Sequence, residues 1–350
     1  MKKSTAQKLK EWRRFYRQNG LPDEQIDPLL NYAEVLLKKG VPVIYDLNHL
    51  CALLGLKKNY VCSVVFCSKV FYRTFEMKKR SGGTREICVP YHSLKYLQAW
   101  IYSEILSKIP INRSAHGFVR KRSILTNAKV HQGQDCLLKI DLKDFFPSIP
   151  INWVTQVFKK IGYTNDVAFY LASICCLEGV LPQGAPTSPA LSNIIASWMD
   201  KRLYKLCVAY NYKYSRYADD IGISGAYISE SFISTVTDVI QDCGFTVNNN
   251  KTRLYGQQGN KILAGVSLAN GDVRIPRNYR RSLEKDLFYI MKYGYDAHVA
   301  HNKVRKANYL QSTMGKVDYW LMIEPKNEMA LKAKDYLSKI YKERVINCKF

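Results

Sequence analysis

Two adjacent carboxylates between two short apolar runs constrain the fold of this chain more than any other feature. Asp219 and Asp220 follow the β-prone run from Tyr212 to Tyr217 and precede the run from Ile221 to Ser224. The pattern predicts a β-hairpin with both aspartates at its tip. Because adjacent like charges repel each other, the pair favours a bound cation, and two Mg²⁺ ions ~4 Å apart need carboxylates that bridge them. Taken alone, an Asp-Asp pair is more often a solvated turn.

A third carboxylate lies upstream of the hairpin. An apolar run from Cys136 to Ile140 precedes Asp141. A strand that ends at Asp141, placed beside the hairpin, would bring this carboxylate to the same ions. The segment also fits a helix N-terminus, in which Asp144 or Ser148 caps a helix from Ile151 to Lys160. The two interpretations are compatible.

A loop rich in proline and small residues lies between the two acidic segments. It extends from Leu181 to Pro189 and precedes a predicted helix from Ala190 to Tyr204. Such a loop has a fixed course and little side-chain bulk, so a flat base pair can approach its backbone. A plain turn with a helix cap is the alternative interpretation.

In order and content, these segments resemble the palm motifs of reverse transcriptases, and among those enzymes the bacterial retron type. The resemblance extends from Phe71 to Val266, and five motifs in the expected order are more specific than any single one. The segments that resemble motifs A to E are, in chain order, Asp141 with its neighbours, the loop at Gln183 and Gly184, the hairpin Tyr217 to Asp220, the stretch Gly244 to Lys251, and Leu263 to Val266 at the primer grip.

Two signatures relate the chain to the retron branch. The residues from Asn127 to His131 match the Asn-Ala-x-x-His signature that precedes motif A in retron enzymes. At the second signature, Val-Thr-Gly, the chain has Leu263, Ala264 and Gly265. It keeps the glycine and lacks the hydroxyl, so no RNA contact through a threonine hydroxyl is expected at this position. His131 also fits a structural histidine that packs at the end of a helix.

The resemblance implies a polymerase that uses two metal ions. Asp141, Asp219 and Asp220 would be its catalytic residues. Together with the carbonyl of Leu142 they would hold two Mg²⁺ ions, for which Mn²⁺ could substitute. A primer hydroxyl would attack the α-phosphorus of a dNTP, and positioning with charge neutralisation would supply most of the rate. Phe146 resembles the steric gate that excludes a ribose 2′-hydroxyl, and without the motif it would be a core aromatic.

Basic segments supply the remaining expected contacts. A hairpin from Lys78 to Arg85, with cations around a Gly-Gly turn, could close on the triphosphate or could be a solvated tip. The expected dNTP-binding residues are Lys79, Arg85, Asp144, Phe145, Phe146, Gln183, Gly184 and Lys251. The expected RNA-binding residues are Asn127, His131, Arg277, Arg280, Arg281, Lys303, Arg305 and Lys306.

Composition favours a polyanionic partner. The chain has 350 residues and a formal charge of +24, so it can bury a sizeable core and would attract nucleic acid. Its ten cysteines form no regular framework and its six histidines do not cluster with them, so we expect reduced thiols and no zinc site. The sequence shows no signal peptide and no apolar run near ~20 residues, so we expect a soluble, cytoplasmic protein without a membrane partner.

The expected fold class is α+β. It is a right-hand polymerase fold whose palm is an antiparallel sheet that bears the catalytic carboxylates and packs on helices. The expected divisions are a basic N-terminal helical region (1–45), fingers with part of the palm (46–135), a palm with motifs A to E (136–270) and a helical, RNA-binding thumb (271–350). Thumb helices are predicted at Arg277–Tyr293, Asn302–Lys316 and Glu328–Lys342.

The retron resemblance implies an RNA-directed DNA polymerase that copies a cognate non-coding RNA, which is both template and primer. Its product would be branched, RNA-linked single-stranded DNA (msDNA), and its setting anti-phage defence with a separate effector protein. The alternative is a reverse transcriptase of another phage-defence or abortive-infection class, with untemplated or protein-primed synthesis. A non-catalytic RNA-binding protein would be expected to lack Asp141 or Asp219, and a viral RNA polymerase more often has Gly-Asp-Asp at the hairpin.

Overall fold

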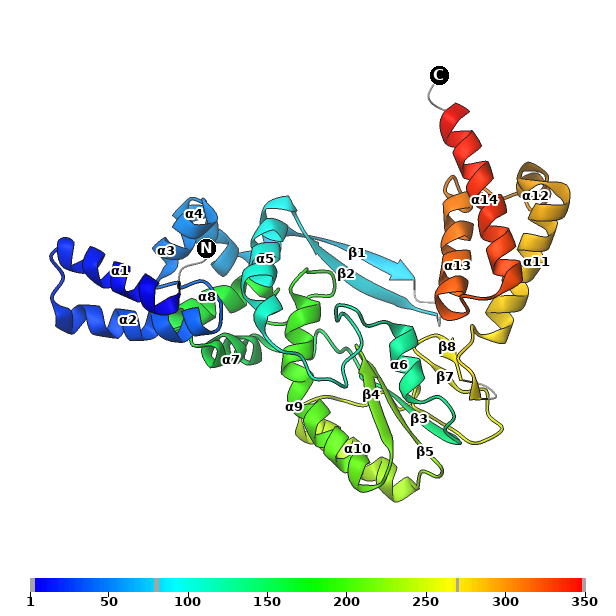
Figure 1. Cartoon of the computed structure of the whole chain (residues 1–350), viewed down its shortest axis with the longest axis horizontal. Helices are drawn as coiled ribbons and strands as arrows, with labels where there is room; N and C mark the ends of the chain where they lie inside the picture. The colour runs from blue at the N-terminus through cyan, green and yellow to red at the C-terminus, as the bar shows by residue number, and fades with distance from the viewer. Residues whose placement is uncertain (1–3, 79–81, 269–270, 348–350) are drawn as a thin grey trace. The chain divides into compact units, whose positions relative to one another are not determined.

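The computed structural model describes residues 4–78, 82–268 and 271–347 (Figure 1). By their internal contacts, the residues form two compact units, each assembled from segments that are separate in the sequence. Unit 1 comprises Met1–Phe118, Leu142–Arg202 and Val239–Thr246, and unit 2 comprises Val119–Asp141, Leu203–Asp238 and Val247–Phe350. The four-part division expected from the sequence stays a prediction.

Unit 1 is mainly helical. Its helices and 3₁₀ turns are α1 (Thr5–Gln18), α2 (Asp23–Lys38), α3 (Leu47–Leu54), α4 (Lys58–Phe66), η1 (Ser68–Phe71), α5 (His92–Glu104), η2 (Leu106–Lys108), α7 (Ile151–Ile161) and α8 (Asn165–Cys175). Side-chain caps explain several starts, because Ser4 forms a capping box with Gln7 at α1 and Asp46 accepts the backbone N–H of His49 at α3. Pro22 lies between α1 and α2 and is the N-cap of α2.

Unit 1 also contains the predicted basic hairpin. Strands β1 (Tyr72–Lys78) and β2 (Thr84–Pro90) pair antiparallel, and Lys78 lies opposite Thr84 at the turn end (Figure 1). Two long helices, α9 (Ser188–Ala209) and α10 (Glu230–Asp242), have residues in both units. The predicted helix after the proline-rich loop is present as α9, which begins at Ser188, two residues before the predicted start, and ends at Ala209, five residues beyond the predicted end.

Unit 2 is built on a four-stranded antiparallel sheet. Its strand order is β4-β5-β3-β6, with β4 at Lys213–Tyr217, β5 at Asp220–Gly225, β3 at Cys136–Asp141 and β6 at Arg253–Tyr255. Helix α6 (Ile124–Val130) packs on this sheet at β4, and the short pair β7 (Ile262–Leu263) and β8 (Val266–Ser267) follows in sequence. The sheet and its helix confirm the predicted α+β class.

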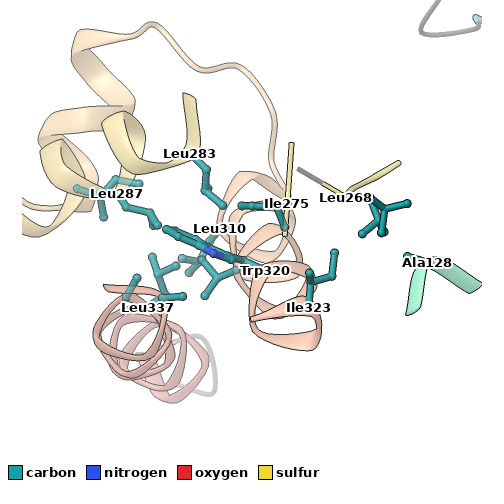
Figure 2. Close-up of a cluster of buried hydrophobic side chains, with 14 of the residues drawn as sticks. Ala128, Leu268, Ile275, Leu283, Leu287, Leu310, Trp320, Ile323 and Leu337 are labelled. Atoms are coloured by element: carbon teal, nitrogen blue, oxygen red, sulfur yellow. The ribbon is translucent and has the colours of Figure 1, made fainter. Parts of the chain in front are cut away.

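The C-terminal part of unit 2 is a helical bundle with its own core. It contains α11 (Arg277–Tyr293), α12 (Tyr295–His301), α13 (Tyr309–Ile323) and α14 (Glu328–Asn347). Figure 2 shows the indole of Trp320 among Leu310 of its own helix and leucines of α11 and α14, and Trp320 is fully buried. Burial of this many aliphatic groups around one large aromatic ring stabilises the bundle.

One predicted helix of the bundle is wrong. The sequence predicts a helix at Asn302–Lys316, but the structure ends α12 at His301 and begins α13 at Tyr309. Asn302 donates its side-chain amide to the carbonyl of His298, which satisfies the end of α12, and Lys303 has a left-handed φ of 49°. Among the described residues, no helix combines the length and apolar character needed to cross a membrane.

Candidate active site

The predicted hairpin is present, and its turn is held by a buried arginine. Tyr217 pairs with Asp220, so Ala218 and Asp219 form a two-residue turn. Ala218 has a φ of 56°, and tight hairpin turns need a positive φ at this position. Arg216, which is fully buried, donates from Nη1 to the carbonyl of Ala218 at 3.0 Å. The guanidinium therefore holds the backbone that presents Asp219.

Strand β3 brings the third carboxylate beside this hairpin. Asp141 is the last residue of β3 and pairs directly with Asp220 of β5. Residues that lie directly opposite in an antiparallel pair have Cβ atoms about 4.5–5.5 Å apart and point to the same face. Asp141 is 5% exposed. The predicted strand beside the hairpin is thus confirmed, and it places two of the three carboxylates side by side.

Each of these two carboxylates has a lysine partner. Lys251 Nζ lies 3.0 Å from Asp141 Oδ1 and 3.2 Å from Oδ2, and Asn248 donates its amide to Oδ1 at 3.1 Å. The backbone N–H of Asn248 also donates to the carbonyl of Asp141 at 2.8 Å. Lys139 Nζ lies 3.1 Å from Asp220 Oδ1, close enough for an ion pair, although that oxygen receives no well-directed hydrogen bond. The lysines neutralise part of the cluster's charge.

Burial and mutual repulsion raise two of the carboxyl pKa values. The pKa of Asp219 is raised from 3.8 to about 6, first by burial and then by the charge of Asp220. The pKa of Asp220 is also raised, by burial above all, and the nearby Lys139 opposes that rise. Burial thus penalises the charged form of both carboxylates, and the nearby lysines offset only part of that penalty.

The donor set fits hard divalent cations. Three carboxylates offer the oxygen ligands that Mg²⁺ prefers, and Asp220 Oδ1 is a buried oxygen without a well-directed donor. Among the described residues, no three Asp, Glu, His or Cys side chains are arranged as a ready-made ion cage. Lys251 and Lys139 instead stand where a cation would balance Asp141 and Asp220.

The Asn-Ala-x-x-His signature forms a buried hydrogen-bonded chain. His131 Nδ1 lies 2.7 Å from Ser224 Oγ, and His131 Nε2 lies 2.7 Å from Ser215 Oγ. Ser215 in turn donates to Asn127 Oδ1 at 2.8 Å. A Cβ on Gly222 would lie 2.8 Å from His131 Nε2, so glycine leaves the room that the imidazole occupies. This chain of hydrogen bonds joins the end of α6 to both strands of the hairpin that bears Asp219 and Asp220.

This burial corrects the expected RNA contacts of Asn127 and His131. Asn127 is 0% and His131 1% exposed, so neither side chain reaches solvent in this structure. A fully buried side chain cannot contact a bound RNA directly. The structural histidine that the sequence left as an alternative is the interpretation that the structure supports.

The proline-rich loop of unit 1 lies against the basic hairpin. Cys88 of β2 donates its backbone N–H to the carbonyl of Gln183 at 2.9 Å. Gly184 has a φ of 134°, and a Cβ there would lie 2.6 Å from the carbonyl oxygen of Cys88. The position therefore requires glycine, because any side chain would collide with the backbone of β2.

Phe145 and Phe146 have different surroundings within unit 1. Phe145 is buried and its ring lies 5.7 Å from that of Phe245. Phe146 is half-buried, with ring centroids 5.6 Å from Phe145 and 6.1 Å from the exposed Phe118. Phe145 is thus a core residue by its side chain, and Phe146 keeps an accessible edge. Asp144 is exposed with a left-handed φ of 46°.

Among the described residues, the lysines and arginines expected to bind nucleotide or RNA are exposed, except for Arg280. Arg85 is exposed on β2, and Lys79 lies outside the described residues. In the bundle, Arg280 is half-buried and its Nε lies 3.1 Å from Glu284 Oε1. The exposed members of the expected RNA-binding set are Arg277, Arg281, Lys303, Arg305 and Lys306.

Sequence reasoning missed several residues of the site. Lys139 precedes Asp141 by two positions, and the period of a strand puts both on one face, so alternation could have found it. Ser215 and Ser224 have no such local signal, because their partner His131 lies at the end of α6. The bond from Arg216 to the carbonyl of Ala218 depends on the geometry of the turn, which no sequence pattern marks. Lys251 was expected to bind the dNTP, and here it pairs with Asp141.

Comparison with known proteins identifies the class. The chain belongs to the family described as reverse transcriptase (RNA-dependent DNA polymerase), whose model matches residues 77–268. The polymerase is of the retron type, as its curated relatives show. Reverse transcriptases in general use divalent metal ions.

Two of these relatives define the extent of the similarity. The retron Ec86 reverse transcriptase of Escherichia coli is 29% identical over 308 residues, which cover 87% of this chain and 92% of that protein. The retron Mx65 reverse transcriptase of Myxococcus xanthus is 38% identical over 251 residues, which cover 66% of this chain and 58% of that protein. A telomerase structure from Candida albicans in complex with telomeric RNA aligns with this chain at a TM-score of 0.42 and 12% identity. The alignment covers 79% of this chain and 60% of that one.

Proposed function

We propose that this RNA-directed DNA polymerase copies a structured non-coding RNA, encoded beside its own gene, into branched, RNA-linked single-stranded DNA. The observation that most supports the proposal is the pairing of Asp141 with Asp220, with Asp219 in the adjoining turn, in a retron-type chain. Synthesis would begin from a 2′-hydroxyl of the RNA itself, so the enzyme must hold a folded RNA rather than a free end.

The proposed metal ligands are the carboxylates of Asp141, Asp219 and Asp220 with the carbonyl of Leu142. Two Mg²⁺ ions bound there would neutralise the charge that develops on the transferred phosphoryl group. The chain's own residues prepare the site: Arg216 holds the turn and Asn248 orients Asp141. Lys251 would release Asp141 and become available to the triphosphate as a proton donor.

The proposed nucleotide contacts rest on the family resemblance. Phe146 would close the pocket beneath the sugar, and its half-buried ring has an accessible edge for that role. Gln183 and Gly184 would lie at the nascent base pair. Position 184 requires glycine independently of this role, because a Cβ there would collide with the backbone of β2. Arg85 and Lys79 would reach the phosphates, together with the backbone of Asp144 and Phe145.

The proposed RNA-binding surface is the basic part of the helical bundle. It comprises the five exposed cations Arg277, Arg281, Lys303, Arg305 and Lys306. Phosphate contacts from such residues fix the position of an RNA without reading its sequence. We further propose that a separate effector protein completes an anti-phage system.

The experiment is to co-express the chain with its flanking DNA and isolate the nucleic acid that it holds. The expected product is a small DNA whose mobility shifts after treatment with a debranching enzyme and with RNase. DNA that is unbranched, untemplated or attached to protein would instead assign the chain to another class of phage-defence reverse transcriptase. An Asp219→Asn chain, expressed in the same way, is the control for DNA that the host supplies.

A further inference from the structure

Unit 1 has a groove that the proposed chemistry does not use. Its volume is about 700 Å³, and residues of α7 and α9 form most of its walls. The floor is apolar, with Val157 and Ile161 from α7 and Ile194 from α9. Helices α7 and α9 are labelled in Figure 1.

The rim of the groove is basic. Lys39, Lys108, Lys160 and Lys201 line it, and no aspartate or glutamate does. Lys39 donates to the carbonyls of Lys160 and Ile161 at 3.0 and 2.7 Å, which places its charge at the C-terminal end of α7. Within the described residues, the other three lysines form no ion pair. Their charge is therefore available to an anionic ligand.

An indole ring stands at the edge of the same groove. Trp198 of α9 is 66% exposed, which is unusual for so large an apolar side chain. A second indole, Trp153 of α7, lines the groove and packs edge-on against Phe245 at 5.7 Å, so its position is fixed. An exposed ring with an open face beside several cations is the combination with which proteins bind single-stranded nucleic acid.

We propose that this groove binds a single-stranded segment of the substrate RNA. The lysines would contact successive phosphates, and Trp198 would stack on a base. The inference rests on the proposed function, because it assumes that the chain binds a structured RNA. An acidic peptide would match the charge too, but RNA requires no further partner, and the enzyme must hold RNA before any DNA exists.

The test uses the full-length enzyme, with its polymerase site first saturated by an unlabelled RNA template annealed to a DNA primer. A fluorescent oligouridylate of about 15 nucleotides is then titrated in. We expect Trp198→Ala to weaken binding about 5-fold or more, because it removes one base stack. Trp198→Phe should retain most of the affinity, because phenylalanine still offers a ring on which a base can stack. Tyr227→Ala removes a ring that is 71% exposed outside the groove and is the matched control.

Salt dependence tests the lysines independently. The double variant Lys160→Ala/Lys201→Ala should make the negative slope of log affinity against log salt shallower by about 1.4, since each phosphate contact on a single strand contributes about −0.7. Lys57→Ala/Lys58→Ala removes the same charge from exposed positions outside the groove and should leave the slope unchanged. If groove and control variants bind the oligouridylate alike, the RNA proposal is wrong and the groove belongs to a protein partner.

Primer extension on the preformed template–primer separates this inference from the proposed function. All groove variants should extend the primer at the wild-type rate, because none of the altered residues belongs to the carboxylate cluster. A wild-type enzyme that fails to extend the primer would refute the proposed function. Wild-type extension with no oligouridylate binding would refute the groove alone.

Discussion

At the carboxylate cluster, burial and like charge act in the same direction on individual residues. Asp219 and Asp220 are adjacent, and burial raises the pKa of both. Lys139 and Lys251 offset only part of this cost. The two adjacent carboxylates therefore lower the stability of the metal-free protein. Such a cluster is expected where a bound cation completes the charge balance.

Asp219→Asn should abolish DNA synthesis and leave RNA binding nearly intact, because the substitution removes an ion ligand and not the basic surface. Primer extension in Mg²⁺ on an RNA template is the measurement. Asp335→Asn, at an exposed position of α14, is the control. A rate above about a tenth of wild type would exclude Asp219 as a metal ligand, since loss of such a ligand costs several kcal/mol.

The same substitution should stabilise the metal-free protein at high pH. The pKa of Asp219 in the folded chain, about 6, lies above its ordinary value of 3.8, so its favourable contribution is complete below 3.8 and is lost as the pH rises through 6. Above that pH, Asn avoids a cost of roughly 1 to 2 kcal/mol, or a few degrees in Tm. Thermal unfolding with a chelator should show this gain at pH 8 and little gain at pH 4, and an equal effect at both would contradict the assignment.

Phe146→Ala should weaken the choice between sugars. If the ring closes the pocket beneath the 2′ position, its loss should raise ribonucleotide relative to deoxynucleotide incorporation by about 10-fold or more. Single-nucleotide incorporation with each substrate measures the ratio, which does not depend on how much enzyme is active. Phe146 also packs against Phe145 and Phe118, so thermal unfolding should be followed in parallel. An unchanged ratio would make Phe146 a packing residue only.

Among the elements, α6 is held by contacts with residues distant in the sequence. Its C-terminal end is joined to β4 and β5 through His131, Ser215 and Ser224. His131→Ala should lower the free energy of unfolding of the protein by about 2–4 kcal/mol, because it removes a partner from the buried hydroxyls of Ser215 and Ser224 and leaves a cavity beside Gly222. Amide hydrogen exchange in β4 and β5 should then be faster than in the unaltered protein, because the hairpin opens more often. His301→Ala, at an exposed position, is the control, and equal exchange in both variants would contradict this role.

The elements also show what the sequence could and could not predict. Helix α11 has the predicted bounds, because its apolar spacing is regular and Pro276 and Gly294 flank it. The break between α12 and α13 was not foreseen, since residues 303–308 include good helix formers and the stop depends on Asn302 and on the left-handed Lys303.

Some residues of the candidate site could be predicted from the sequence and others could not. The three aspartates were predictable because each lies at the end of an apolar run, and strand pairing then brings Asp141 beside Asp220. The histidine chain was not predictable, since a signature names the residues without showing their partners. Only the fold shows that Asn127 and His131 are interior residues rather than RNA contacts.

For the whole molecule, net charge sets the strength of nucleic-acid binding. The chain has a formal charge of +24, and most of that excess is solvated. Such a surface attracts any polyanion, so affinity at a single salt concentration says little about a particular site. The dependence on salt counts the phosphate contacts and is the informative quantity.

The bundle surface makes a numerical prediction at this scale. Arg280 is paired with Glu284, which leaves about five cations for the RNA backbone. At about 0.7 per contact, affinity for the cognate RNA should fall at least about 100-fold between roughly 50 and 200 mM salt. Arg277→Gln/Arg281→Gln should make the negative slope of log affinity against log salt shallower by about 1.4. Lys332→Gln/Lys339→Gln, which removes the same charge from exposed positions of α14, should leave the slope as it is, and equal slopes in the two double variants would place the RNA elsewhere on the protein.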